Sequence, residues 1–210
     1  VLALAARDLN AALQAVDGLA NDDDRRRCLA AMARQLVPLD ARRALQVAER
    51  IDPRIVREGM LLGVMDVALE QSVEAAQAVS DRIIEPLLND YAAAGIAASG
   101  ATADFQKASQ LAGSIESSFV KQWAYLAMLL AIASEDPERA LTLESKLQLA
   151  HHLDELHARS AAVLAATDAD KALTVALRIG DRRVRVRTLL EVTRRLFPTR
   201  PAFAFHLLRQ

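Results

Sequence analysis

Cysteine is nearly absent from this 210-residue chain, because Cys28 is the only one. A single cysteine excludes an internal disulfide, and we therefore expect a reducing, cytoplasmic location. Aromatic residues make up only 4%, and there are only seven glycines and six prolines. A chain that is poor in helix-breaking residues and rich in alanine favours tightly packed helices. With 52% hydrophobic and 25% charged residues, it has the composition of a globular protein with an ample core.

The chain also lacks an excess of either charge and has no long apolar run. The formal net charge is -1, which excludes a global basic field that would hold nucleic acid by charge alone. No apolar stretch approaches the ~20 residues of a membrane helix, so we expect no membrane contact. The first eight residues lack the basic region of a signal peptide. The segment from Trp123 to Ser134 holds eleven apolar residues before its serine, which is an unusual helix for a soluble chain.

What the chain does contain is a repeat with a step of 32 residues. One column holds alanine in every repeat, and another, seven residues later, holds leucine or isoleucine. A third column, four residues before the alanines, holds aspartate or serine in six repeats and then Arg200. Such a register identifies an array of supersecondary units. The alanine column is Ala12, Ala44, Ala76, Ala108, Ala140, Ala172 and Ala204, and the cap column is Asp8, Asp40, Ser72, Asp104, Asp136 and Asp168.

Each repeat is predicted to form two helices. The first helix begins at the cap column, whose short side-chain oxygen accepts from free N–H groups. The second helix carries apolar residues at i, i+3, i+4 and i+7, as in Leu29, Met32, Ala33 and Leu36. We therefore predict an all-α fold, an α-α superhelix (solenoid) of about six 32-residue hairpins forming a single domain over residues 1–210. Because both ends fall in mid-repeat, we expect a fragment of a longer array.

Two turns resemble those of HEAT-like repeats. That family carries an aspartate in the turn and a Val-Arg pair opening the second helix. The matching segments are "IDPRIVR", with Asp52 and Val56-Arg57, and "GDRRVRVR", with Asp181 and either Val184-Arg185 or Val186-Arg187. The layout is also similar to tetratricopeptide repeats, although their period is 34 and their Trp-Leu-Gly-Tyr pattern is missing. The resemblance implies a scaffold that binds protein or nucleic acid, and fold alone does not fix which.

The predicted second helices are apolar on the face opposite the core as well. In a solenoid these helices line the concave inner face, which is the usual binding surface. Tyr91 and Trp123 share one column in consecutive repeats, so we expect two aromatic platforms about 10 Å apart. Basic residues bracket them, as at a protein interface. The candidate partner-binding residues are Tyr91, Trp123, Leu126, Leu62, Arg57, Lys121, Arg185 and Arg187.

These residues predict a non-catalytic scaffold whose partner is a protein or peptide segment with apolar and acidic residues. Three alternatives stay open. The aromatic side chains could simply fill gaps between hairpins, the inner face could be covered by self-association, or inward Arg and Lys could hold a nucleic-acid backbone.

Repeat five departs from the pattern of the others and is the one candidate for a catalytic or metal-binding site. Glu144 and His157 stand in columns that are otherwise mainly apolar, and His151 and His152 lie at the turn. However, no HExxH motif, paired cysteines, GxSxG motif or phosphate-binding loop occurs in the chain. We therefore predict no catalytic site, no metal and no cofactor, with an enzyme centred on Glu144 and His157 as the least supported alternative.

Overall fold

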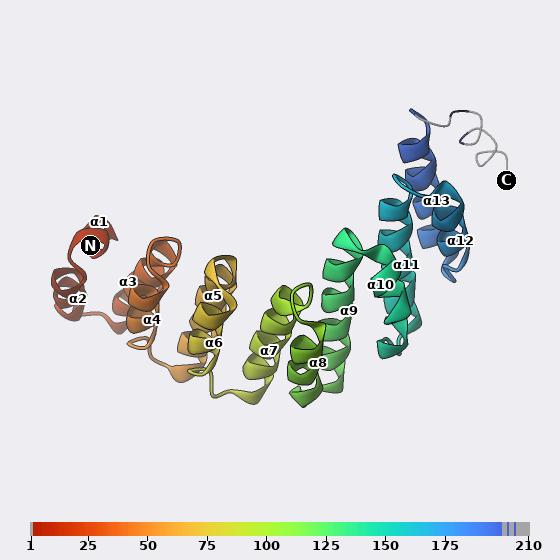
Figure 1. The fold of residues 1–210 in the computed structure, drawn as a ribbon. Coiled ribbons are helices and arrows are strands. Elements are labelled where there is room, and N and C mark those ends of the chain that lie inside the picture. Colours follow the sequence, from red (N-terminus) through yellow and green to blue (C-terminus); the bar gives the residue numbers. More distant parts are fainter. Residues whose placement is uncertain (1, 199–200, 202–203, 205–210) are drawn as a thin grey trace. The chain divides into compact units, whose positions relative to one another are not determined.

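The computed structural model describes residues 2–198, 201 and 204, and throughout this part of the chain the regular secondary structure is helical (Figure 1). The prediction of an all-α fold is confirmed. Within the same residues, no helix combines the length and the apolar character needed to cross a bilayer.

The helices alternate between two kinds, as the repeat predicts. The first helices are α2 (Leu9–Asp17), α4 (Ala41–Ala48), α6 (Val73–Ser80), α8 (Phe105–Ser114), α10 (Pro137–Thr142) and α12 (Ala169–Leu177). The second helices are α3 (Asp22–Leu36), α5 (Arg54–Gln71), α7 (Pro86–Gly100), α9 (Ser118–Glu135), α11 (Ala150–Leu164) and α13 (Arg182–Leu196), preceded by the short α1 (Leu2–Arg7). After α10 the chain forms a 3-10 turn, η1 (Glu144–Lys146).

The cap column determines where each first helix begins. All six predicted residues accept a hydrogen bond from a backbone N–H in the first turn of their helix, as Asp168 does from Lys171 N at 3.0 Å. Pro137 occupies the first turn of α10, where its missing N–H costs nothing. Arg200, the last member of the column, lies outside the described residues.

The alanine column forms the centre of the core. Its seven members are buried, and so are the isoleucines and the leucine that follow them at Ile51, Ile83, Ile115, Leu147 and Ile179. Alanine has no side chain beyond Cβ, so a first helix can approach its neighbours closely at this position. On the opposite side of the first helices the side chains are exposed. They form ion pairs between residues 33 apart: Asp17–Arg50, Glu49–Arg82 and Glu138–Lys171. Each such surface pair contributes at most about 1 kcal/mol.

The chain divides into two compact units, Val1–Ile96 and Ala97–Gln210, which we call the N-terminal and C-terminal units. In the N-terminal unit α1 packs against α3 and α3 against α5, while α2 and α4 each contact the second helices on either side of them. In the C-terminal unit α9 packs against α11 and α11 against α13, with α10 and α12 placed in the same way. The second helices therefore form a layer within each unit. One array over residues 1–210 stays a prediction.

A column on the second helices connects three of them, α5, α9 and α11, to the turn that follows. Glu58 accepts from Glu85 N at 2.6 Å, and Gln122 accepts from Gln148 N at 2.9 Å. Asp154 accepts from Gly180 N at 2.7 Å and from Asp181 N at 2.9 Å. The four residues at this position, Glu58, Asp90, Gln122 and Asp154, are 32 apart. This linking column was not recognised from the sequence.

Burial tends to raise the pKa of the Glu58 carboxyl, because desolvation disfavours its charged form. Hydrogen bonds from Arg54 and from the backbone N–H groups of Glu85 and Ile84 outweigh this effect, so the net shift of the pKa is downward. Glu58 therefore stays ionised while 1% exposed, and a charged acceptor binds the turn more strongly than a neutral one.

Replacing Asp154 tests the linking column. Asp154→Ala leaves the N–H groups of Gly180 and Asp181 without their acceptor, and we expect the free energy of unfolding to fall by about 2–3 kcal/mol. Asp154→Asn, which keeps one carbonyl oxygen, should fall between this variant and the wild type. Urea unfolding followed by circular dichroism measures the difference. Asp170→Ala, an exposed aspartate on α12, is the control, and an equal loss there would contradict the role given to Asp154.

Candidate binding groove on the second helices

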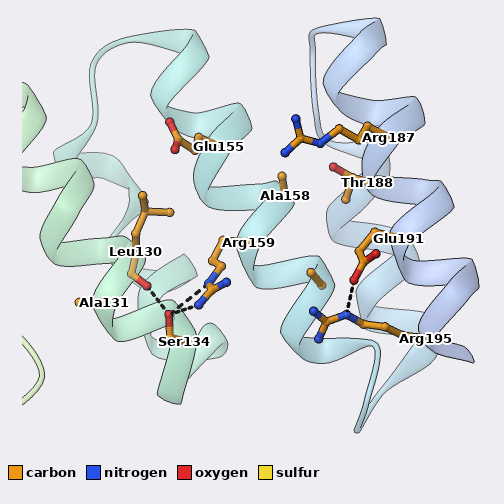
Figure 2. A pocket seen from close by; sticks show the side chains of 11 residues that line it. Leu130, Ala131, Ser134, Glu155, Ala158, Arg159, Arg187, Thr188, Glu191 and Arg195 are labelled. Carbon is orange, nitrogen blue, oxygen red and sulfur yellow. Dashed lines mark hydrogen bonds and ion pairs between the residues drawn. The ribbon is translucent and has the colours of Figure 1, made fainter.

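A groove of about 600 Å³ crosses the second-helix layer of the C-terminal unit (Figure 2). Its residues come from α9, α11 and α13, which are three successive second helices. The residues that line it are Leu130, Ala131, Ser134, Glu155, Ala158, Arg159, Ala162, Arg187, Thr188, Glu191 and Arg195. We call this surface the binding groove.

The repeat explains why these side chains meet. Trp123, Glu155 and Arg187 occupy one column at a step of 32, so each faces the same way on its own helix. Four residues later, and so on the same helix face, Arg159 and Glu191 share the next column. The groove thus lies on the face of the second helices that these columns share, with charged side chains along it and a floor formed by Leu130 and three alanines.

Arg159 reaches from α11 to the end of α9. Its Nε and Nη2 donate to the hydroxyl oxygen of Ser134 at 3.1 and 2.8 Å, as Figure 2 shows. Ser134 in turn donates to the carbonyl oxygen of Leu130 at 2.9 Å. Because the partner of Arg159 is a neutral hydroxyl, this contact orients the guanidinium group without neutralising its charge.

Glu191 is the acid at the other side of the groove, and two arginines share it. Arg194 donates to both of its oxygens at 2.9 Å, and Arg195 donates to Oε1 at 2.7 Å. These hydrogen bonds, from Arg194 and then Arg195, lower the pKa of Glu191 to about 2. The carboxylate is therefore fully ionised near neutral pH and already occupied.

Arg187 differs from the other groove arginines. Its guanidinium group extends from α13 toward α11, and it forms no hydrogen bond or ion pair with the residues that the structure describes (Figure 2). It belongs to a helix with six arginines and a single acid, Glu191. Since the whole chain has a net charge of -1, positive charge is concentrated on α13.

Trp123 lies on the groove side of α9, because Ala127, Ala131 and Ser134 follow it on that face at helical spacing. It is 43% exposed, while its ring packs edge-on against Phe119 at 6.1 Å and against His152 at 4.9 Å between ring centroids. Trp123 therefore fills part of the gap to α11 and still presents an aromatic surface to solvent.

His152 forms the buried side of this aromatic contact. It is 0% exposed, and burial lowers its pKa, with the nearby His151 adding to the effect and Glu155 opposing it. Burial therefore favours the neutral form of the imidazole.

The other residues predicted for binding are distributed over both units. Tyr91 on α7 is 44% exposed, and Leu62 and Arg57 on α5 are half-buried; all three lie in the N-terminal unit. Lys121 and Arg185 in the C-terminal unit are also half-buried, and Arg185 donates to the carbonyl oxygen of Ile179 at 3.2 Å. Of the eight predicted residues, only Arg187 lines the binding groove.

The expectation that Leu126 contacts a partner is wrong, because its side chain is 1% exposed. Leu126 lies seven residues, about two turns, before the buried Ala133, so it falls on the core side of α9. In a helix that is apolar almost all round, sequence alone does not distinguish this edge of the core from the neighbouring stripe of Trp123 and Leu130. The packing of α9 against its neighbours makes that distinction.

Arg159, Ser134 and Arg195 were not among the predicted site residues. Arg159 was recognisable as unusual in the sequence, because its column holds the small residues Gly63, Gly95 and Ala127 in the preceding repeats. Ser134 and Arg195 were not recognisable, because polar residues near the end of a helix are common and only packing brings these two to the groove.

The N-terminal unit carries a smaller groove on the same helix face. It has a volume of about 440 Å³ and lies between α3 and α5, and Gly59 stands in the column of Trp123 and Arg187. Its lining is mostly apolar, with one basic residue: Arg34, Val37, Val56, Gly59, Met60, Gly63 and Val67.

The polar residues of repeat five form a separate cluster. His157 Nε2 lies 2.9 Å from Glu144 Oε2, and Arg178 donates to the other carboxylate oxygen. Burial raises the pKa of Glu144, but the hydrogen bonds from His157 and Arg178 outweigh it and the net shift is downward. The cluster joins α11, η1 and the end of α12. Within residues 2–198, 201 and 204, no three acidic, His or Cys side chains gather as metal ligands would.

Comparison of the chain with protein families, curated proteins and solved structures finds no match. The assignment of a function therefore rests on the geometry of the second-helix layer.

Leu126→Ala tests the core position of that residue. We expect the free energy of unfolding to fall by about 2–5 kcal/mol, because the substitution leaves a cavity in a fully buried site. Leu130→Ala, which removes a half-buried leucine from the groove floor, should cost clearly less. Chemical denaturation of the two variants decides the point, and equal losses would show that Leu126 is no deeper in the core than Leu130.

The ion pairs of Glu191 predict a specific dependence of stability on pH. Its pKa is about 2 in the folded chain against an ordinary value of 4.5, so its contribution is fully present above about pH 4.5 and is lost as the pH falls toward 2. We expect Glu191→Gln to be less stable than wild type at pH 7, with the difference shrinking below pH 4.5. Urea midpoints measured from pH 7 to pH 2 test this, and a difference that stays constant over that range would be inconsistent with it.

Proposed function

We propose that this chain is a HEAT-like α-solenoid scaffold without catalytic activity that binds a protein or peptide segment on the inner face of its second helices. The observation that carries the proposal is the binding groove, which crosses three successive second helices. A groove that crosses three helices and has an apolar floor and polar walls fits a segment of chain better than a small molecule.

The regularity of the fold supports the solenoid part of the proposal. Caps recur at a step of 32 residues, and the second helices pack on one another in succession from α1 to α5 in the N-terminal unit and from α9 to α13 in the C-terminal unit. Stacked units of this kind leave one face of the layer free of covering helices. That face is hollowed in both units, at equivalent columns of the repeat.

A nucleic-acid backbone is the second candidate, and the six arginines of α13 are the observation that favours it. Against it stand the apolar groove floor and the two glutamates among the lining residues, which would repel a continuous row of phosphates. The net charge of -1 also provides no long-range attraction for a polyanion.

Affinity capture from a lysate of the source organism, with and without nuclease, tests the scaffold proposal. We expect the full chain to retain a protein that survives nuclease treatment. Tyr91→Ala combined with Trp123→Ala should reduce its recovery at least about tenfold, because exposed aromatic residues often carry most of an interface's energy.

The matched control is Leu39→Ala combined with Leu177→Ala. Both leucines are exposed apolar residues that lie off the second-helix face, so their removal should leave capture unchanged. Equal loss in both double variants would point to non-specific apolar adhesion. Capture that disappears with nuclease and ignores Tyr91 and Trp123 would favour the nucleic-acid candidate.

A further inference from the structure

We propose that the binding groove takes an acidic segment of a protein, whose carboxylates contact Arg159 on α11 and Arg187 on α13. This inference rests on the proposed scaffold function and names the chemistry of its partner. It goes beyond the sequence expectation in two ways. Arg159 was not among the predicted site residues, and the carboxylates of the partner are now placed at two named arginines.

The first argument is the charge left over in the groove. Glu191 already has two arginines, Arg194 and Arg195, on its oxygens, and Arg195 is the one of the two that lines the groove. The lining as a whole holds three arginines against two glutamates, so it carries one positive charge in excess. Arg187 is without an ion pair among the described residues, and Arg159 is bound only to the neutral Ser134 hydroxyl. Glu155 is the only other acid that lines the groove. A ligand with carboxylates placed at Arg159 and Arg187 would complement this charge.

The second argument is the chemistry of the guanidinium groups of Arg159 and Arg187, neither of which has an acidic partner among the described residues. A guanidinium group presents parallel N–H donors that match the two oxygens of a carboxylate, and such charge-assisted pairs are about twice as strong as neutral hydrogen bonds. Arg159 is already held toward the groove by Ser134, so little side-chain freedom is lost when a ligand binds. Exchanging the Ser134 hydroxyl for a ligand carboxylate replaces a neutral acceptor with a charged one.

The third argument is the position of the aromatic surface along α9. Trp123 lies eleven residues before Ser134, which corresponds to about 16 Å along the helix axis. In an extended peptide this distance spans about five residues. The geometry therefore favours a segment with an apolar side chain on Trp123 and an acidic residue about five positions away, near Arg159.

A nucleic acid fits these features less well. Its backbone carries a charge at every nucleotide, whereas the groove alternates acids and bases, with Glu155 and Arg187 in one column and Arg159 and Glu191 in the next. A peptide can place its carboxylates only at the arginines and avoid the glutamates.

The test is the selection of a random 12-residue peptide library against the full chain. We expect the selected peptides from wild type to be enriched in Asp and Glu, with an apolar residue about five positions from the acid. One such peptide, labelled with fluorescein, is then titrated by fluorescence anisotropy. Arg159→Ala combined with Arg187→Ala should weaken its binding at least about tenfold, since each arginine supplies a charge-assisted contact.

The matched control removes two positive charges from the start of α13, outside the groove. Arg182 and Arg183 are exposed at the start of α13 and do not line the groove, so Arg182→Ala combined with Arg183→Ala should retain binding within about twofold. Thermal unfolding of both double variants confirms that they fold. Equal weakening in the two would show non-specific attraction to α13 and overturn the proposal.

The remaining outcomes separate this inference from the function on which it rests. Selected peptides that lack acidic residues but are lost with Trp123→Ala would overturn the acidic partner and keep the scaffold. A library that yields no binders would overturn both. A fluorescein-labelled 12-nucleotide single-stranded DNA that binds more tightly than the peptide, with steep salt dependence, would replace the acidic segment with nucleic acid.

Discussion

The structure depends on one recurring hydrogen bond, from the backbone of a turn to a side chain on the second helix before it. The N–H groups that begin a helix have no partner within that helix, and leaving them buried and unpaired is costly. In this chain a residue 26 or 27 positions earlier provides the acceptor: Glu58, Gln122 or Asp154. The bond joins consecutive repeats directly, and it fixes the height at which α7, α11 and α13 start beside the preceding second helix.

One turn is an informative exception. Counting one repeat back from Glu58 and Glu85 leads to Arg26 and Pro53. Proline has no backbone N–H, so this turn needs one acceptor fewer, and the column can hold an arginine. Arg26 instead pairs with Asp23 inside α3. At this turn the side-chain acceptor and the backbone N–H donor are both missing. Their joint absence is expected if the role of the column is to form this hydrogen bond.

Second helices that are held in register have consequences for the groove. Because each helix starts at an equivalent residue, side chains 32 apart face the same way, and the column of Trp123, Glu155 and Arg187 runs across α9, α11 and α13. The same regular frame thus carries an aromatic residue on one helix, an acid on the next and a base on the third. Variation along a column gives each position on this face of the second helices its own chemistry without altering the packing below it.

The sequence by itself determined the local structure and the period. Short polar side chains at a step of 32 predicted the six helix caps, and small apolar residues predicted the core columns, because both depend on interactions within a few residues along the chain. Only the tertiary structure decided which side of α9 is buried, so that Leu126 belongs to the core while Trp123 stays exposed. It also decided that Ser134 holds Arg159 and that Glu191 is occupied by Arg194 and Arg195, which leaves Arg187 free of ion pairs with the described residues. The sequence could not supply these assignments, because they depend on distances between side chains of different helices and on competition among several arginines for few acids.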